Sequence, residues 1–231
     1  MRIGIVSAFG KETKPLRSKL EEIRRESIKT YVFFLLRYGD EDVMVAKTGS
    51  GKVQGAEGAR LLIERFHPGI IVNCGVAGAI SPERKIGDVV ISRRVIEYDT
   101  IDDNNLKDKV YYADANLFHY ALQVSNETMQ KRKTVAGDVL SGDRVVKEVH
   151  EREALWKRFQ GECVEQEGAG VARICQLHNI PWIVIKGISD RADEHALTDF
   201  KKNVDSASKN VALVTIEIMK RVLRGHPGTN I

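Results

Sequence analysis

Residues 164–170 read Val-Glu-Gln-Glu-Gly-Ala-Gly, and residues 182–190 read Trp-Ile-Val-Ile-Lys-Gly-Ile-Ser-Asp. The first segment predicts a strand that ends in two carboxylates and leads into a helix opened by small residues. The second begins with an unbroken apolar run, which is typical of a strand buried on both faces of a sheet. Open α/β sheets bind ligands at the carboxyl ends of their strands. We therefore expect an α/β fold whose ligand site contains Glu165, Glu167 and Asp190.

Length and composition fit one α/β domain, because 231 residues with 42% hydrophobic content are enough for a sizeable core. Lys and Arg number 36 against 32 Asp and Glu, and no basic arm is present, so we expect no nucleic-acid partner. Three widely spaced cysteines fit reduced thiols, which predicts a cytoplasmic location. The N-terminal segment soon turns polar, unlike a signal peptide. No apolar run approaches membrane-spanning length, so no membrane partner is expected.

Hydrophobic periodicity predicts strands that alternate with helices. Strands are expected at residues 3–6, 31–36, 43–46, 70–72, 88–96, 133–140 and 182–185, and helices at about 12–25, 53–66, 116–129, 149–159 and 204–223. The strands at 31–36 and 43–46 flank a turn-forming segment, which predicts a hairpin and hence a mixed sheet. We expect a loop at 98–114, a single domain over 1–224 and a flexible tail at 225–231.

Two glycine-rich segments are candidate ligand sites. Gly49-Ser50-Gly51-Lys52 lacks the full phosphate-loop pattern, because Ala46 stands where its first glycine would be and Val53 follows the lysine. We interpret this segment as a tight turn between a strand and a helix. Gly75-Val76-Ala77-Gly78 follows a buried strand, where small residues let a ligand approach the backbone amides. An ordinary strand-to-helix turn would have the same composition, so this segment alone decides nothing.

The acidic candidates also have structural interpretations. Glu12 could satisfy the dipole at the start of a helix, and Asp190 could cap one. Lys186 could simply pair with a nearby acid. Glu165 and Glu167 share a face if the strand continues, although either could be a solvated strand-end carboxylate. Three acids are costly to gather unless they hold hydroxyls, a metal or a proton in transit. The six histidines show no metal-ligand spacing, so we expect no metal.

Taken together, these segments resemble one known family. The blocks that carry the resemblance occur in the family's order at Ile3–Glu12, Lys47–Val53, Asn73–Gly78, Ile86–Val90, Ser141–Asp143, Val164–Gly168 and Ile188–Asp190. The chain resembles the purine nucleoside phosphorylase/uridine phosphorylase superfamily, and within it most closely the 5′-methylthioadenosine/S-adenosylhomocysteine nucleosidases. The resemblance implies a three-layer α/β/α domain around a mixed, partly barrel-like central sheet, the nucleoside phosphorylase-like fold. It also implies a homodimer with a purine nucleoside as its small-molecule partner.

The resemblance implies a role for each matching residue. Glu12 matches the glutamate that activates water, Glu167 the one that binds the ribose hydroxyls, and Asp190 the acid that protonates the purine. Further substrate-binding positions are implied at Ser50, Val76, Ala77, Gly78, Val145, Val146, Glu165, Gln166, Ser189 and Phe200. The backbone at 145 and 146 would face the purine, and no metal or organic cofactor is implied.

These residues suit the cleavage of an N-glycosidic bond. A carboxylic acid at purine N7 can donate a proton as the bond stretches, if its pKa is raised. A second carboxylate can accept a proton from water on the opposite face of the sugar, as in inverting glycosidases. A phosphate nucleophile would need fixed cations, typically arginines. The stretch Ile71–Cys74 lacks the arginine of the phosphorylases, and the first loop offers only Lys11. We expect water to be the nucleophile.

The predicted activity is release of adenine from 5′-thio-substituted adenosines. A purine nucleoside phosphorylase, a hydrolase for another 5′-modified purine nucleoside of the futalosine type and a non-catalytic nucleoside sensor stay open as alternatives. Three departures from the family bear on the choice. Gln166 replaces a methionine, Val76 replaces a serine found in many relatives, and the segment after Thr100 is short and polar. In the family that segment helps to enclose the 5′-substituent, often across the dimer interface.

Overall fold

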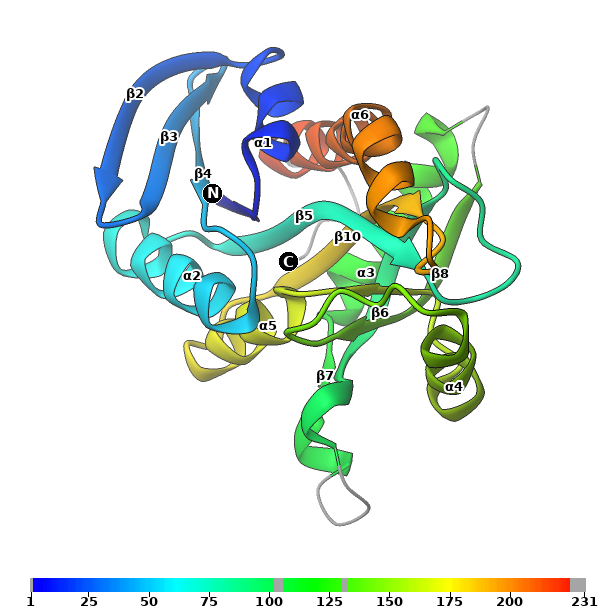
Figure 1. Ribbon diagram of the computed structural model, residues 1–231. Coiled ribbons are helices and arrows are strands. Elements are labelled where there is room, and N and C mark those ends of the chain that lie inside the picture. Colours follow the sequence, from blue (N-terminus) through cyan, green and yellow to red (C-terminus); the bar gives the residue numbers. More distant parts are fainter. Residues whose placement is uncertain (1, 102–105, 130–132, 225–231) are drawn as a thin grey trace.

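The computed structural model describes residues 2–101, 106–129 and 133–224, and Figure 1 shows its ribbon. The strands are β1 (Ile3–Ser7), β2 (Glu21–Ile28), β3 (Tyr31–Tyr38), β4 (Glu41–Lys47), β5 (Ile70–Ala79), β6 (Val89–Glu97), β7 (Val110–Tyr112), β8 (Thr134–Ser141), β9 (Cys163–Glu165) and β10 (Trp182–Asp190). The helices are α1 (Gly10–Arg17), α2 (Lys52–Phe66), α3 (Ala115–Thr128), α4 (Val149–Phe159), α5 (Gly168–Leu177) and α6 (Ala196–Leu223), with 3-10 turns η1 (Tyr98–Thr100) and η2 (Leu106–Lys109). The tail expected at 225–231 lies outside the described residues.

All ten strands belong to one mixed sheet, as the sequence predicted. Its order is β10-β6-β8-β9-β5-β1-β4-β3-β2, and β7 pairs with β6. Strand β10 also pairs with β5, so β5, β10, β6, β8 and β9 close into a barrel-like ring. The remaining strands extend from this ring as an open sheet that ends at β2, an edge strand paired only with β3 among the described residues.

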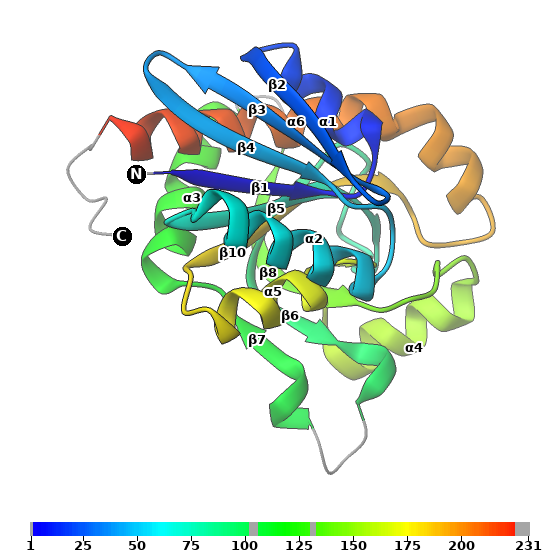
Figure 2. The ribbon, with the colours of Figure 1, turned by 90° about the vertical axis from the view of Figure 1, so that its left-hand side faces the viewer.

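Helices cover both faces of the sheet and give the three layers that were expected. Figure 2 shows α2 and α5 on one side of the open strands and α1 and α6 on the other. Neighbouring residues of the central strands pack into different layers. Ile5 and Ile183 belong to the core beneath α6, whereas Val6 and Val184 belong to the core beneath α2 and α5. This two-sided burial explains the continuous apolar runs. No helix among the described residues is long and apolar enough to cross a membrane.

The expected helix at about 12–25 is wrong in its second half. Helix α1 ends at Arg17, and the Ser18 N–H donates to the Lys14 carbonyl at 2.9 Å. The chain then forms β2, which pairs antiparallel with β3. The residues of β2 are mostly exposed and have no apolar period. Their strand conformation therefore comes from pairing with a neighbour, which local sequence patterns do not reveal.

Three further boundaries differ from the expectations. Residues 110–112, expected within a loop, form β7 against Arg94–Ile96 of β6. Strand β5 does not stop at Val72 but continues through the small residues to Ala79, because these pair with β10. Helix α6 begins at Ala196, two turns before the expected start. The sequence did not predict these first turns because they are polar and have little apolar periodicity.

Candidate active site

A cavity of about 260 Å³ lies where several strands reach their carboxyl ends. It is lined by the ends of β5, β9 and β10, the loops after β1, β4 and β8, and the first turns of α6. All of the site residues predicted from the sequence line it: Glu12, Ser50, Val76, Ala77, Gly78, Val145, Val146, Glu165, Gln166, Glu167, Ser189, Asp190 and Phe200. The fold therefore brings together segments that are up to about 190 residues apart in the chain.

Glu12 reaches the cavity from the first turn of α1 and is held by the backbone of two segments. Its Oε2 accepts hydrogen bonds from the N–H groups of Ala8 at 2.8 Å and Phe9 at 2.9 Å, and its Oε1 accepts one from Val76 at 2.8 Å. A Cβ atom at Gly75 would lie 2.5 Å from Oε1, so a glycine is required for this approach. Burial raises the pKa of Glu12, whereas the Lys186 charge and these N–H donors oppose the rise.

Asp190 ends β10 and is buried in the wall of the same cavity. Its Oδ2 accepts a hydrogen bond from the Ser189 hydroxyl at 2.8 Å, and its Oδ1 accepts one from the Ala192 N–H at 3.0 Å. A Cβ at Gly78 would lie 2.7 Å from Oδ1, so a second glycine makes room for this acid. Burial raises the pKa of Asp190. Asp190 does not cap α6, whose N-cap is His195.

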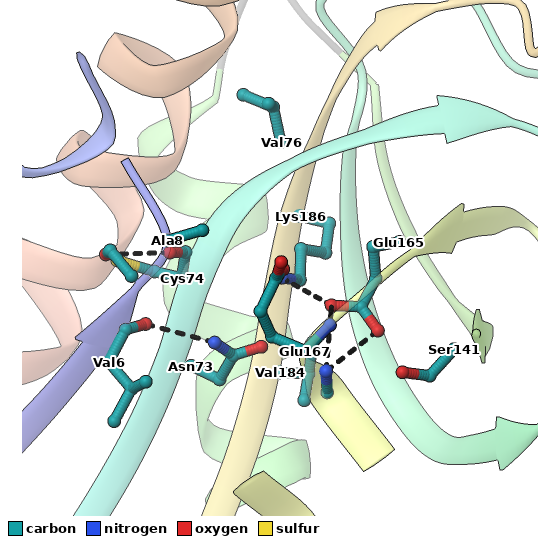
Figure 3. A network of polar contacts seen from close by, with 12 residues as sticks. Val6, Ala8, Asn73, Cys74, Val76, Ser141, Glu165, Glu167, Val184 and Lys186 are labelled. Atoms are coloured by element: carbon teal, nitrogen blue, oxygen red, sulfur yellow. Dashed lines mark hydrogen bonds and ion pairs between the residues drawn. The ribbon is translucent and has the colours of Figure 1, made fainter. Parts of the chain in front are cut away.

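Glu165, Glu167 and Lys186 form a buried charged network below the cavity, drawn in Figure 3. The Lys186 ammonium lies 2.8 Å from Glu165 Oε2 and 3.8 Å from Glu167 Oε2. The Glu165 carboxylate also accepts from the N–H groups of Glu167 at 3.0 Å and Gly168 at 2.9 Å. Lys186 therefore pairs with a nearby acid, as one interpretation held. Glu167 itself accepts a longer hydrogen bond from the Gly51 N–H at 3.2 Å.

The two glutamates of this network differ in ionisation because they have different partners. Burial alone would raise both pKa values, but the Lys186 charge and hydrogen bonds lower the pKa of Glu165 below its ordinary value. Burial dominates at Glu167, and its pKa rises to about 8, helped by the charges of Glu165 and Glu12. Glu165 thus holds Lys186 as a fixed ion pair, whereas Glu167 exchanges a proton near neutral pH.

The cavity has an apolar mouth. The Phe9 and Phe200 rings meet edge to face with centroids 6.2 Å apart. Leu197, which is 57% exposed, lies beside them, and Val145 and Val146 line the opposite wall after β8. Five further residues line the cavity and were not expected from the sequence: Phe9, Leu197, Arg144, Val164 and Ala196. Val164 lay inside the quoted motif, but exposed apolar residues in loops and first helical turns carry no pattern that marks a cavity wall.

Positive charge is scarce around this cavity. Among the described residues that line it, Arg144 carries the only positive charge, and its side chain is 74% exposed and pairs with Glu151 at 2.8 Å. Lys11, the lysine of the first loop, pairs with Asp205 outside the cavity at 3.6 Å. Within residues 2–101, 106–129 and 133–224, no group of three His, Cys, Asp or Glu residues is arranged to hold a metal ion.

A family model described as the phosphorylase superfamily matches residues 2–220. The chain belongs to the phosphorylase superfamily. Among curated members, the chain is 32% identical to the 5′-methylthioadenosine/S-adenosylhomocysteine nucleosidase of Exiguobacterium sp. (strain ATCC BAA-1283 / AT1b) over 96% of its own length and 99% of the relative. It is 30% identical to the enzyme of that name from Buchnera aphidicola subsp. Acyrthosiphon pisum (strain APS), again over 96% and 99% of the two chains.

Solved structures of the superfamily have the same fold. The 5′-methylthioadenosine/S-adenosylhomocysteine nucleosidase of Neisseria meningitidis, in complex with methylthio-immucillin-A, superposes with a TM-score of 0.89 at 26% identity, over 95% of this chain and 98% of that one. The native futalosine hydrolase of Helicobacter pylori superposes with a TM-score of 0.88 at 26% identity, over 96% and 98%. This fold is therefore shared by a methylthioadenosine/S-adenosylhomocysteine nucleosidase and by a futalosine hydrolase.

Proposed function

We propose that this chain is an N-glycosyl hydrolase that releases adenine from 5′-thio-substituted adenosines such as methylthioadenosine and S-adenosylhomocysteine. The observation that carries the proposal is that Glu12, Glu167 and Asp190 line one cavity at the carboxyl ends of the strands. Relatives at 30% and 32% identity over nearly the full chain bear the corresponding enzyme name. The proposal gives each of these carboxyl groups a separate task.

Asp190 is the general acid in this mechanism. Its raised pKa favours the protonated form that a donor needs. As the bond between C1′ and purine N9 stretches, the acid gives its proton to N7, and adenine leaves as a neutral base. The Ser189 hydroxyl bound to Oδ2 then stabilises the carboxylate that remains. General acid catalysis of this kind is worth about a hundred- to ten-thousandfold in rate.

Glu12 and Glu167 act on the sugar side. Glu12 accepts a proton from the water that adds to C1′. Burial raises its pKa, which makes the carboxylate a stronger base, and its three backbone N–H donors and Lys186 limit that rise. Glu167 accepts hydrogen bonds from the ribose hydroxyls, which fixes the ring as it gains positive character. Glu165 lines the cavity, but its oxygens are occupied by Lys186 and two backbone N–H groups, so it supports Glu167.

Water is the nucleophile favoured by the charges around the cavity. A phosphate nucleophile needs fixed cations, and among the described lining residues the only one is an exposed arginine, Arg144, which is already paired with Glu151. The apolar mouth formed by Phe9, Leu197 and Phe200 suits a thioether substituent, because apolar walls gain free energy from covering apolar atoms. These two observations favour hydrolysis of 5′-thio-substituted nucleosides over phosphorolysis.

Incubation of the purified protein with methylthioadenosine in phosphate-free buffer tests the proposal. We expect adenine and the 5-thio-substituted ribose in equal amounts. Absence of adenine, or its release only after phosphate is added, would reject the hydrolase. Parallel incubation with S-adenosylhomocysteine, with adenosine and with a futalosine-type nucleoside separates the candidate substrates. The futalosine-type compound is included because a futalosine hydrolase is among the structural neighbours.

The proposal includes a cytoplasmic homodimer. The exposed apolar side chains on the side of α2 and α5 support the dimer: Val53 is 73% exposed, Leu177 68% and Tyr112 66%. Helices α2 and α5 pack side by side, and Figure 2 shows them in one layer with β7 nearby. A second copy that covers this face would remove the apolar side chains from water. Three separate cysteines, all reduced in this structure, fit a cytoplasmic location.

A further inference from the structure

Lys52 carries the largest cluster of ion pairs next to the candidate site. The side chain is 10% exposed, and its ammonium lies 2.9 Å from Glu97 Oε1 and 2.5 Å from Asp99 Oδ1. A third carboxylate, Asp143 Oδ2, lies 3.6 Å away. Glu97 is additionally 3.5 Å from Lys109. Three carboxylates from β6, η1 and the loop after β8 thus converge on the first residue of α2.

The same residues hold the loop that follows β8. The backbone N–H of Lys52 donates to Asp143 Oδ1 at 2.9 Å, so Asp143 caps α2 in place of Gly51, which has no side chain. The backbone N–H of Asp143 donates in turn to Asp99 Oδ2 at 2.8 Å. The loop also lies against η1, because a Cβ at Gly142 would come within 2.4 Å of the Tyr98 ring. Side chain and backbone contacts therefore fix one loop from two sides.

This loop continues directly into the cavity wall. Arg144, Val145 and Val146, which follow Asp143, all line the cavity. The N-cap residue of α2, directly before Lys52, also contacts the site, because the Gly51 N–H donates to Glu167 Oε1. The start of α2 therefore touches both the wall after β8 and the acid proposed to bind ribose.

We propose that Lys52 is a positioning residue that holds the loop Gly142–Val146 in place and thereby sets the affinity of the enzyme for the base of its substrate. The inference rests on the proposed function, because it takes the base to lie against this loop. Lys52 is not among the described residues that line the cavity, so its influence passes through Asp143 and Asp99. With the ammonium removed, the largely buried Glu97 and Asp99 would repel each other, Asp143 would lose its cation, and the loop would shift.

The ion pairs also explain why the segment Gly49–Lys52 is not a phosphate site. In phosphate loops the lysine is free to reach the anion. Here the Lys52 ammonium already has three carboxylate partners, and these would repel a phosphate. Lys52 thus forms ion pairs with carboxylates of the protein itself. The segment Gly49–Lys52 is a tight turn between β4 and α2.

Substitution of Lys52 by methionine tests the inference. Methionine keeps much of the length and the apolar stem but removes the charge. We expect the Kd for adenine, measured by calorimetry, and the KM for methylthioadenosine to rise about tenfold, while kcat falls less than threefold because the acids of the reaction stay in place. Lys52→Arg retains a cation at this position and should recover affinity to within about threefold of the wild type.

A matched control comes from the same helix. Arg60 pairs with Glu57 at 2.8 Å and with Glu64 on the surface of α2, away from the cavity. Arg60→Met removes the same type of ion pair and should leave the Kd and KM unchanged. If Lys52→Met does not fold, Asp99→Ala tests the same link, since it removes the contacts to Lys52 and Asp143 while Glu97 still pairs with the lysine.

The outcomes separate the two proposals. A folded Lys52→Met protein with wild-type adenine affinity and wild-type KM overturns the inference, as does an Asp99→Ala protein with both values unchanged. An equal loss of affinity in Arg60→Met would also overturn it, because any lost ion pair on α2 would then have the same effect. A wild-type protein that releases no adenine from methylthioadenosine rejects the proposed function instead.

Discussion

At the residue scale, three buried acids of the site differ in their pKa values because their surroundings differ. Glu165 has an ammonium and two backbone donors, and its pKa falls. Glu167 has one long hydrogen bond and lies 3.8 Å from the Lys186 ammonium, and burial raises its pKa to about 8. Burial raises the pKa of Asp190, and its hydrogen bonds from Ser189 and Ala192 oppose the rise. The protein thus separates acids that stay charged from acids that can carry a proton.

Asp190→Asn tests the assignment of the general acid. The amide keeps the size of the side chain but cannot give up a proton to N7. We expect kcat to fall about a hundred- to ten-thousandfold, with the Kd for adenine within about threefold of the wild type. Steady-state kinetics and calorimetry measure the two quantities. Asp205→Asn, at a surface acid paired with Lys11, is the control and should keep full activity. Wild-type turnover by Asp190→Asn would place the acid elsewhere.

Glu167 gives the folded protein a distinct pH dependence. Its carboxyl binds a proton more tightly in the folded chain, where its pKa is about 8, than in the unfolded chain, where it is near 4.5. The resulting contribution to stability is full below about pH 4.5 and is lost as the pH rises through 8.

Glu167→Gln removes this dependence, because the amide does not ionise. We therefore expect the Tm of the variant, minus that of the wild type, to increase between about pH 5 and pH 8 and to level off by pH 9. Thermal melts of the ligand-free proteins across this range measure the difference. Glu153→Gln, at an exposed side chain, should follow the wild-type curve. A constant difference between Glu167→Gln and the wild type would contradict the raised pKa.

The sequence was informative about polar site residues and much less so about apolar ones. Glu12, Glu167 and Asp190 stood at strand exits or helix starts, and the resemblance assigned them roles. Phe9 and Leu197 escaped notice because an exposed apolar residue in a loop or first turn fits many surroundings. The pairing of Lys186 with Glu165 was one of several possibilities, since the distance between β9 and β10 depends on the closed ring of strands.

At the element scale, Lys186 joins β10 to the end of β9 inside the ring. Lys186→Met would leave Glu165 and Glu167 buried without a cation. We expect a loss of about 3–5 kcal/mol in the free energy of unfolding, measured by urea denaturation. Adding Glu165→Gln removes one of the stranded charges and should recover a large part of that loss.

The control for this prediction is Lys220→Met on α6. Lys220 pairs with Glu217 at 3.9 Å on the surface, and its loss should cost less than about 1 kcal/mol. A Lys186→Met protein that loses no more than the control would show that the buried ion pair contributes little. Equal stability of the single and double variants would show that Glu165 is not its partner.

Helices and strands with a strong apolar pattern of their own were predictable from the sequence. Strand segments that form only because they pair with another strand were not. Strands β3 and β4, and the helices α3 and α4, follow their own sequence patterns within a few residues. Strand β2 has five charged residues among eight and was mistaken for the end of a helix. The extension of β5 through Gly75–Gly78 depends on its register with β10. The pairing of β5 with β10 joins segments about a hundred residues apart, and periodicity within one segment reports neither this pairing nor that of β2 with β3.

At the scale of the whole molecule, the exposed apolar face of α2 and α5 predicts association. Leu177→Glu places a charge where the second copy would bury an apolar side chain. We expect the wild type to elute as a dimer and the variant to shift toward the monomer, measured by size-exclusion chromatography with light scattering. Leu213→Glu is the control, because Leu213 is a 48% exposed leucine on α6, in a different layer. A monomeric wild type, or an equal shift in both variants, would contradict this interface.

The free border of the sheet limits how copies of this chain can join. Strand β2 presents unpaired backbone groups to solvent, which in many proteins recruit a strand from a neighbour. Glu21, Glu22, Arg24, Arg25 and Glu26 surround those groups with strongly hydrated side chains of both signs. Addition of a further strand along β2 would therefore require desolvation of these charged side chains. Association through the apolar face of α2 and α5 therefore costs less desolvation free energy than association through β2.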